Sequence, residues 1–361
     1  MTALSLKTDQ SLNEAAVDSL LRQAGRDSDR MTVSLCAPGG NNRIFEIGLP
    51  GERLVVKHYA RRSTVGRDRM LSEWAFLKFA EAAGLSCTPR ALAIDLDADL
   101  ALYEFVDGTK CHAKDISDGA IDKVAAFVRG LNSPQARQLG ASLPEASETS
   151  FSISGHLAIT ETRLARLTSA CDEDNDGALA RSVSRLDATF ERLRNILIRD
   201  CERSGLDVES KLALTERVIS PSDLGFHNLL VRPDGEFVFV DFEYAGWDDP
   251  AKLVADFFLQ PAVPVSAVHR DAFVRYALPE LSDAGHRRLS LLHPLFALRW
   301  CLIFLNPFLP DWIERHPSAL NGVSLAELRR ARLERAGQLT EEVENLLREA
   351  ESGPAPNYAR L

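Results

Sequence analysis

Cysteine pairs and basic charge are the two features that this 361-residue sequence most clearly lacks. Its six cysteines are scattered, without a Cys-x-x-Cys pair, so we expect neither a zinc module nor a disulfide-bonded secreted domain. Acidic residues outnumber basic ones by 52 to 42, a net charge of −10, whereas nucleic-acid-binding proteins usually carry a basic face. We expect a cytoplasmic protein with no nucleic-acid partner. The negative charge would suit a cationic substrate, but solubility explains it equally well.

The sequence also has little that would place it in a membrane. Its first ten residues lack the basic start and the apolar stretch of a signal peptide. The most apolar segment, residues 291–310, is about as long as a membrane span, but it contains His293, Arg299, Asn306 and three prolines. Because charges and prolines inside a span are costly or rare, we expect a buried helix of a soluble protein and no membrane partner.

What the sequence does contain is a strand-rich first part and a helical remainder. Alternating apolar residues and turn signals predict strands at 31–37, 43–48, 53–59, 90–96 and 101–106. Helical spacing predicts helices near 11–25, 67–83, 119–132, 156–170, 178–203, 265–277, 283–305 and 325–350. This order predicts an α+β fold with a small β-rich N-lobe and a large, mainly helical C-lobe. We expect a helical extension over 1–28, the N-lobe over 29–106 and the C-lobe over 107–361, with ligands in the cleft between the lobes.

Three polar side chains surround an expected hairpin in residues 220–250. Two runs of β-branched and aromatic residues flank the turn Arg-Pro-Asp-Gly. The midpoint between Asn228 and Asp241 falls in this turn, so these two residues are expected to face each other at the open end of the hairpin, with Asp223 in the loop before it. Their oxygens suit Mg²⁺ bound beside phosphates, and Asp223 would be free to accept a proton from an attacking hydroxyl. Each residue alone would more often cap a turn or end a strand, but together they predict a phosphoryl-transfer site.

The motif Asp-Leu-Gly-Phe-His-Asn at 223–228 and the segment Val-Asp-Phe-Glu-Tyr-Ala-Gly-Trp-Asp-Asp-Pro that follows resemble the aminoglycoside phosphotransferase/choline kinase-like family, a branch of the protein-kinase-like fold. The resemblance implies that Asp223 is the catalytic base and that Asn228 and Asp241 hold magnesium. The family commonly has a histidine two residues before the catalytic aspartate, where this sequence has Pro221. That histidine mainly supports the loop, so the difference concerns loop geometry more than chemistry. His227 is interpreted as a loop residue rather than a base.

A phosphate-binding lysine is expected in the N-lobe of such a kinase, with an acid to position it. Lys57 ends an apolar strand, where a purely structural lysine is less expected. Glu73 lies on the helix that follows, so we expect the two to form an ion pair. The alternatives are snorkelling of Lys57 at the strand end and a solvated helix face for Glu73.

The other nucleotide contacts are assigned from the resemblance. Gly40 and Asn41 belong to a turn that would cover the phosphates. Glu104 and Val106 lie where the family's inter-lobe hinge binds adenine through its backbone. These four residues complete the expected nucleotide site.

The segment after the hairpin predicts a helix that begins at Pro250. Asp248 and Asp249 are expected to cap this helix. Asp256, further along it, is expected to brace the catalytic loop rather than to touch substrate.

These features predict an ATP- and Mg²⁺-dependent phosphotransferase that acts on a hydroxyl of a small molecule, such as a sugar, an amino sugar or an amino alcohol. The sequence has no Gly-x-x-x-x-Gly-Lys-Ser/Thr motif of P-loop kinases, and after Asp241 it lacks the Asp-Phe-Gly and Ala-Pro-Glu motifs of protein kinases. The alternative is a nucleotide-binding pseudokinase that regulates a protein partner, which the intact Asp223, Asn228 and Asp241 disfavour. The acceptor and the oligomeric state stay open.

Overall fold

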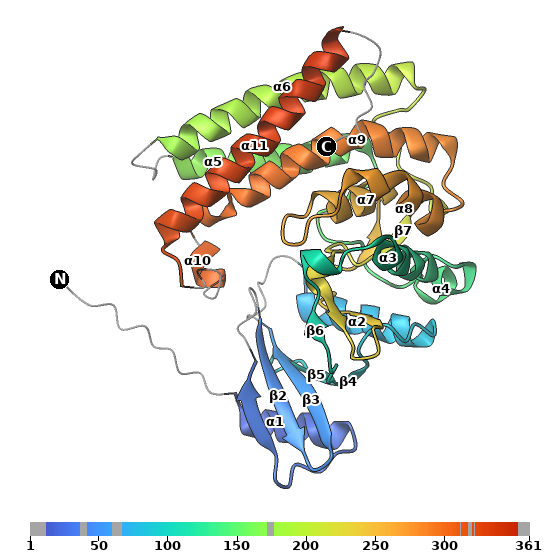
Figure 1. The fold of residues 1–361 in the computed structure, drawn as a ribbon, viewed down its shortest axis with the longest axis vertical. Coiled ribbons are helices and arrows are strands. Elements are labelled where there is room, and N and C mark those ends of the chain that lie inside the picture. Colours follow the sequence, from blue (N-terminus) through green and yellow to red (C-terminus); the bar gives the residue numbers. More distant parts are fainter. Residues whose placement is uncertain are drawn as a thin grey trace, which may run out of the picture.

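The computed structural model describes residues 12–36, 42–59, 67–171, 177–310, 312–316, 320 and 322–352. Figure 1 shows a small lobe built on a β-sheet and a larger helical lobe above it. The two-lobed α+β architecture expected from the sequence is therefore confirmed.

The small lobe contains a five-stranded antiparallel sheet in the order β1-β2-β3-β5-β4. Its strands are β1 (Thr32–Leu35), β2 (Arg43–Leu49), β3 (Glu52–His58), β4 (Ala91–Asp95) and β5 (Leu100–Glu104). Successive side chains of a strand point to opposite faces of a sheet. Leu54 and Val56 of β3 accordingly belong to one apolar core and Val55 to another. Lys57 shares the face of Val55.

Two helices cover the sheet of the small lobe, one on each face. α1 (Glu14–Gln23) packs Val17, Leu20 and Leu21 against the face that carries Leu54, which forms a small separate core. α2 (Arg69–Ala82) packs on the opposite face, within the main core of the protein. Strand alternation therefore turns Lys57 toward α2, the helix that carries Glu73.

The large lobe is mostly helical. Its helices are α3 (Asp118–Leu131), α4 (Pro134–Leu139), α5 (Ile153–Ala170), α6 (Ala178–Arg203), α7 (Pro250–Leu259), α8 (Arg270–Ala277), α9 (Asp283–Phe304), α10 (Trp312–Arg315) and α11 (Leu325–Ser352). In Figure 1, α5, α6, α9 and α11 form an outer layer, and α3, α4, α7 and α8 lie between this layer and the small lobe. The expected helices are found within a few residues of their bounds, but α8 is shorter than expected. Two short helices, α4 with six residues and α10 with four, were missed.

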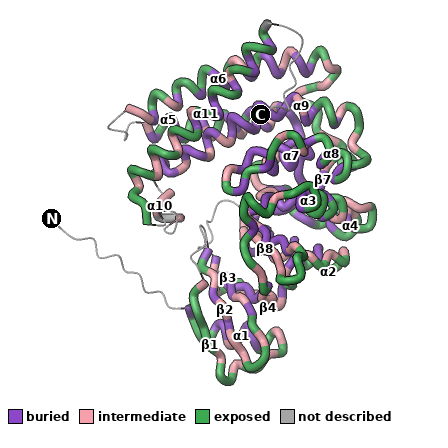
Figure 2. The backbone as a smooth tube through the Cα atoms, in the orientation of Figure 1, coloured by how far each residue is buried: buried purple, intermediate pink, exposed green. Residues whose placement is uncertain are grey.

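Helix α9 forms the centre of the large lobe. Leu292, Leu295 and Leu298 are fully buried, and Figure 2 shows buried residues along both α7 and α9. Within the described part of the chain, one helical segment, Asp283–Phe308, is long and apolar enough to cross a membrane, but 78% of its apolar window is buried inside the protein. The expectation of a buried helix is thus confirmed.

Short strands in the large lobe carry the loops of interest. They are β6 (Thr109–Lys110), β7 (Val218–Ser220), β8 (Leu229–Val231), β9 (Phe237–Phe239) and β10 (Gly246–Asp248). β6, β8 and β9 form one small antiparallel sheet, and β7 pairs with β10. The loop from β7 to β8 contains Asp223, and the chain from β9 to β10 contains Asp241.

The hairpin of β8 and β9 differs from the prediction by one residue in register. The N–H of Val240 donates to the carbonyl of Asn228 at 3.0 Å, so Val240 and not Asp241 faces Asn228. The reason is the length of the turn: the N–H of Arg232 donates to the carbonyl of Glu236 at 2.8 Å, which leaves a three-residue loop. Gly235 in this loop has a left-handed φ of +83°, as is usual for such loops.

Candidate active site

Lys57 is the centre of a buried charge cluster between the two lobes. Its Nζ lies 2.7 Å from Glu73 Oε2 and 2.6 Å from Asp241 Oδ1. Lys57 and Glu73 are 6% and 4% exposed, whereas the side chain of Asp241 is 43% exposed. The ion pair predicted between Lys57 and Glu73 is therefore present, and it is buried rather than part of a solvated surface.

The surroundings of Lys57 keep it charged. Burial would lower the pKa of Lys57, but the carboxylates of Asp241, Glu73 and Glu243 hold that pKa well above its ordinary value. Burial raises the pKa of Glu73, and Lys57 offsets part of this rise. Tyr59 Oη also donates to Glu73 Oε2 at 2.6 Å, which fixes the carboxylate. The cluster thus holds a permanent cation in a defined position.

Asp241 has an unusual backbone conformation that Glu73 helps to hold. Its φ of +69° is left-handed, which is uncommon for a residue other than glycine and costs free energy. The next N–H, of Phe242, donates to Glu73 Oε1 at 3.4 Å. The Phe242 ring is 1% exposed and stacks on Phe76 of α2, with ring centroids 4.5 Å apart. One carboxylate on α2 therefore contacts both Lys57 and the segment that presents Asp241.

Asp223 lies in the loop after β7, in contact with Asn228. Asn228 Nδ2 donates to the carbonyl oxygen and to Oδ2 of Asp223, each at 3.0 Å, and His227 Nε2 lies 3.3 Å from Asp223 Oδ1. Burial would raise the pKa of Asp223, but His227 and Asn228 together hold it below its ordinary value. Asp223 is therefore ionised at neutral pH. His227, interpreted from the sequence as a loop residue, contacts the expected base directly.

A second buried lysine supports the loop that carries Asp223. Lys252 of α7 donates to Ser222 Oγ at 2.7 Å, and its Nζ lies 2.8 Å from Asp256 Oδ2 and 3.3 Å from Asp248 Oδ2. Ser222 precedes Asp223 directly and has a left-handed φ of +64°. Asp256 thus braces the loop of Asp223, as predicted, through Lys252. This lysine gives the loop a support in the absence of the family's usual histidine.

Asp249 caps α7 as predicted and also begins a buried chain of polar contacts. Its Oδ1 accepts from the N–H of Ala251 at 2.8 Å, and its Oδ2 accepts from Arg288 Nη2 at 2.6 Å. His156 Nε2 lies 3.1 Å from the same Oδ2, and His156 Nδ1 lies 3.3 Å from Arg299 Nη2. Since arginine can only donate, His156 accepts at Nδ1 and donates from Nε2.

These contacts predict that stability depends on pH through His156. Burial lowers the pKa of His156 to about 4, although Asp249 opposes this shift. The unfolded chain binds the proton near pH 6.5, so the stabilisation is complete above that pH and is lost as the pH falls toward 4. We expect the free energy of unfolding to fall by about 3 kcal/mol across this window. Urea unfolding at several pH values measures it, and His156→Gln should flatten the dependence; an equally steep dependence in that variant would contradict the assignment.

The expected nucleotide contacts are described only in part. Gly40 and Asn41 lie outside the residues that the structure describes. Glu104 ends β5, and its Oε2 accepts from the N–H and the Nε of Arg90, at 3.2 Å each. The N–H of Val106 makes no hydrogen bond to any described residue.

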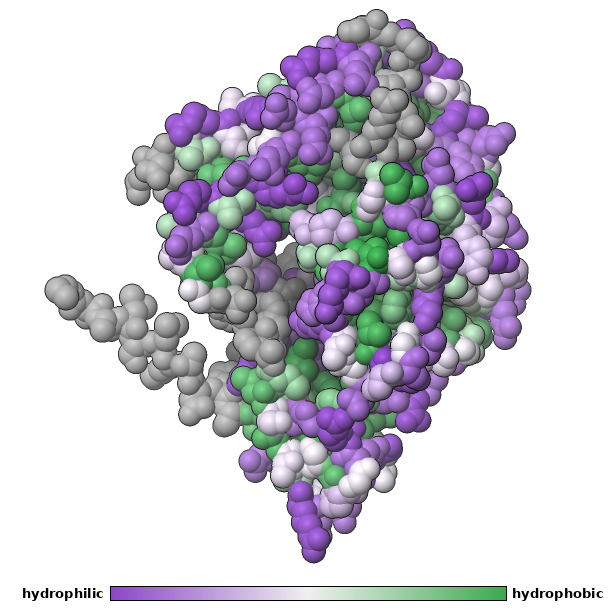
Figure 3. Space-filling model, in the orientation of Figure 1, coloured by the Kyte–Doolittle hydropathy of each residue, from purple (hydrophilic) through white to green (hydrophobic). Residues whose placement is uncertain are grey.

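A cavity of about 560 Å³ opens beside Asp223. Asp223, His227 and Tyr244 line it, together with residues of α5, α9 and α11. Figure 3 shows the surface hollowed between the outer helices and the small lobe. The volume lies in the range of small-molecule sites.

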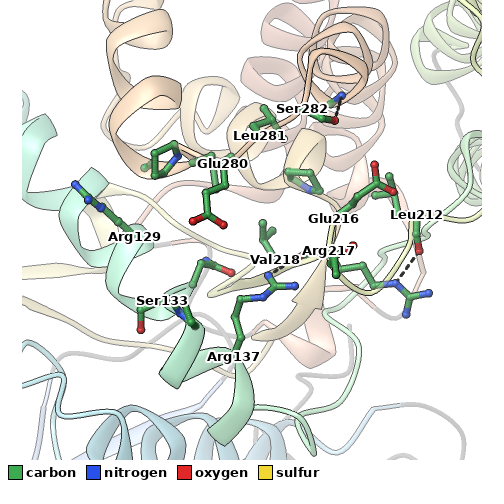
Figure 4. Close-up of a pocket in the computed structure, with 18 of the residues that line it drawn as sticks. Arg129, Ser133, Arg137, Leu212, Glu216, Arg217, Val218, Glu280, Leu281 and Ser282 are labelled. Atoms are coloured by element: carbon green, nitrogen blue, oxygen red, sulfur yellow. Dashed lines mark hydrogen bonds between the residues drawn. The ribbon is translucent and has the colours of Figure 1, made fainter.

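A second cavity, of about 510 Å³, lies within the large lobe (Figure 4). Arg129, Arg137 and Glu280 surround it, and Arg137 Nη2 is tied to the carbonyl of Leu214 at 2.6 Å. None of the predicted catalytic, metal or nucleotide residues lines this cavity. The candidate active site is therefore the cavity beside Asp223.

The sequence interpretation missed Arg67, which ties the small lobe to the segment after Asp241. Arg67 Nε donates to the carbonyl of Glu243 at 3.1 Å, and its terminal nitrogens donate to the carbonyls of Ala245 and Glu145. No local pattern marks this residue, because every one of these partners lies at least 78 positions away along the chain.

Comparisons with known proteins agree with this geometry. The sequence matches the phosphotransferase enzyme family over residues 32–292, whereas no curated protein matches it. The structure is similar to a choline kinase from Streptococcus pneumoniae, with 16% identity, a TM-score of 0.57 and coverage of 92% of this chain and 100% of that one. It is also similar to a choline/ethanolamine kinase family protein from Mesorhizobium loti (16% identity, TM-score 0.57, coverage 94% and 99%). A third similar structure is a spectinomycin phosphotransferase in complex with ADP and spectinomycin (10% identity, TM-score 0.59, coverage 94% and 100%).

The two lobes, the buried Lys57–Glu73 pair and the Asp223 loop define a protein of the kinase-like class. Its sequence match covers well over half of the chain. The chain therefore belongs to the phosphotransferase enzyme family, which confirms the resemblance based on residues 223–250.

Proposed function

We propose that this phosphotransferase transfers the γ-phosphate of ATP to a hydroxyl group of a small molecule and that it requires Mg²⁺. The observation that carries the proposal is the meeting of two groups at one cleft. Asp223 and Asn228 contact each other on the large lobe, and Lys57 joins Glu73 of the small lobe to Asp241 of the large one. Phosphoryl transfer is catalysed mainly by positioning and by charge stabilisation, which such an arrangement supplies.

In the proposed reaction Asp223 is the base. It accepts the proton of the acceptor hydroxyl, whose oxygen attacks the γ-phosphorus of ATP while the bond to the β-phosphate oxygen breaks and ADP leaves. The low pKa of Asp223 keeps the carboxylate ready to accept this proton at neutral pH. Lys57, positioned by Glu73, binds the α- and β-phosphates.

The oxygens of Asn228 and Asp241 fit a magnesium site that is shared with phosphates. They come from neighbouring positions on the hairpin, and Asp241 is the most exposed member of the charge cluster. No group of three His, Cys, Asp or Glu side chains that could hold a metal occurs in the described parts of the chain, which is consistent with Mg²⁺ held by one or two protein ligands. When bound, Mg²⁺ would neutralise charge on the β- and γ-phosphates.

The hinge and the thiols support two further parts of the proposal. We assign the N–H of Val106 and the backbone of Glu104, at the end of β5, to adenine. Gly40 and Asn41 are assigned to the phosphates by resemblance only.

All six cysteines are free, which supports a cytoplasmic location.

Replacing Asp241 with asparagine tests the metal site. The substitution keeps the size of the side chain but removes its charge, so we expect Mg²⁺-dependent ATP binding to weaken by at least about tenfold. Calorimetric titration with ATP at increasing Mg²⁺ measures this effect. Asp234→Asn, in the exposed turn of the same hairpin, is the control and should bind normally. An unchanged magnesium dependence in Asp241→Asn would contradict the assignment.

A further inference from the structure

The cavity beside Asp223 is rich in cationic side chains, although the whole chain carries a net charge of −10. The described basic residues that line it are Arg69, Arg163, Arg166, Lys252, Arg299 and Arg332, and the acidic ones are Glu148, Asp223 and Asp256. An acidic protein that gathers arginines in one cavity creates a local field that attracts anions.

Three of these basic side chains form ion pairs with carboxylates. Lys252 lies between Asp256 and Asp248, Arg163 pairs with Glu148, and Arg69 lies 3.8 Å from Glu243. The remaining three are Arg166 of α5, Arg299 of α9 and Arg332 of α11. Within the described residues, none of these three has a carboxylate within 4 Å.

Arg299 is the most deeply buried of these three arginines. It is 3% exposed, and its terminal nitrogens donate to the carbonyls of Glu148 and His156. Its Nε is buried and has no hydrogen-bond partner. Burial lowers the pKa of this guanidinium to about 10. The carboxylates of Glu148, Asp256 and Asp248 offset part of this shift from a distance, but none of the described ones forms an ion pair with Arg299. A buried arginine with an unsatisfied donor and no direct ion pair is costly, and an anionic ligand would reduce that cost.

Arg332 is the second of these three arginines, and it is less buried than Arg299. It is half-buried, and burial lowers its pKa, with no acidic neighbour among the described residues to offset the shift. Trp300, Phe304 and Trp312 line the same cavity. The cavity therefore offers apolar contact for a carbon skeleton beside unpaired guanidinium groups.

ATP itself does not explain these arginines. Its phosphates are assigned to Lys57 and to the metal held by Asn228 and Asp241, and none of these three residues lines the cavity. The unpaired arginines come from α5, α9 and α11, in the outer layer of the large lobe (Figure 1). They line the cavity of Asp223 and not the cluster around Lys57, so they are placed for the acceptor.

We propose that the phosphate acceptor is an anionic hydroxyl compound, one that carries a carboxylate or a phosphate group. This inference rests on the proposed function. Guanidinium groups bind both kinds of oxyanion through paired hydrogen bonds. The family resemblance suggests amino sugars and amino alcohols as acceptors. Their positively charged amino group would be repelled by the guanidinium groups of Arg299 and Arg332, so we expect them to bind weakly.

Binding of matched sugars of different charge tests the proposal without requiring turnover. Gluconate and glucose 6-phosphate are the anionic probes, glucose is neutral and glucosamine is cationic. Binding is followed by tryptophan fluorescence at constant ionic strength, since Trp300 and Trp312 line the cavity. We expect saturable binding of at least one anionic probe, about tenfold or more tighter than that of glucose and glucosamine. Gluconate and glucose 6-phosphate also distinguish a carboxylate from a phosphate preference.

Arg332→Gln and Arg330→Gln form a matched pair of variants. Both arginines lie on α11, but Arg330 is exposed and does not line the cavity. Arg332→Gln should weaken binding of the preferred anion by about tenfold, while Arg330→Gln should leave it unchanged. Absence of anion binding, equal or tighter binding of glucose or glucosamine, or an equal loss in both variants would overturn the proposal. Formation of a phosphate monoester from ATP is measured on the same protein with neutral and cationic acceptors; if it occurs in these cases, the proposed function stands and the acceptor class alone is wrong.

Discussion

Replacing Asp223 with alanine is expected to lower the rate of phosphoryl transfer by about 10²–10⁴-fold, the usual contribution of a positioned general base. ATP binding should remain nearly intact, because Asp223 contacts Asn228 and His227 and neither Lys57 nor the hinge. Initial rates of ADP formation with a working acceptor, together with the dissociation constant of ATP, measure the two effects separately.

The control for Asp223→Ala is Asp187→Ala, at an exposed position on α6, which should leave the rate unchanged. The melting temperature of both variants shows whether the fold is preserved. Turnover of Asp223→Ala within about tenfold of the unmodified protein would contradict the role of this residue as the base.

Substitution of Lys57 and Glu73 is expected to have the second largest effect. Lys57→Ala should raise the ATP concentration needed for half-maximal rate and lower kcat/KM on the order of 10²-fold, because it removes a fixed charge from the phosphates. Glu73→Ala should act similarly, since it releases Lys57 and also the N–H of Phe242. The double variant should lose far less than the product of the two single losses, because both residues serve one function.

An exposed ion pair on α2, the helix that carries Glu73, provides a matched control. Lys78 and Glu81 of α2 also form an ion pair, with side chains 47% and 44% exposed. Their single and double alanine variants should change kcat/KM little, since exposed pairs contribute little. If the loss of kcat/KM in the Lys57/Glu73 double variant equals the product of the two single losses, the two residues do not act together.

The parts of this site that could be predicted from sequence are those that follow from local periodicity. Strand alternation places Lys57 on the face of the sheet that α2 covers, so its contact with Glu73 was predictable. The hairpin and its turn were predictable for the same reason, but the register was wrong by one residue because the loop contains three residues, closed by Arg232 and Glu236. A left-handed glycine in that turn moves Val240, rather than Asp241, opposite Asn228.

The contacts that could not be predicted join elements whose packing is set only by the complete fold. Lys252 reaches Ser222 over 30 positions of sequence, and Arg299 reaches His156 over 143. No periodic pattern relates such positions. The positive charge of the cavity beside Asp223 was hidden for the same reason: its arginines come from the four helices α2, α5, α9 and α11, and the net charge of the chain has the opposite sign.

Formation of a phosphate monoester from ATP is the most direct test of the central proposal. The protein is incubated with ATP, Mg²⁺ and a panel of anionic, neutral and cationic hydroxyl compounds, and the products are followed by ³¹P NMR. We expect a new monoester resonance that grows in step with ADP for at least one acceptor, and that is lost in Asp223→Ala or when Mg²⁺ is removed. ATP binding without any monoester across the whole panel, or equal monoester formation by Asp223→Ala, would contradict the proposed function.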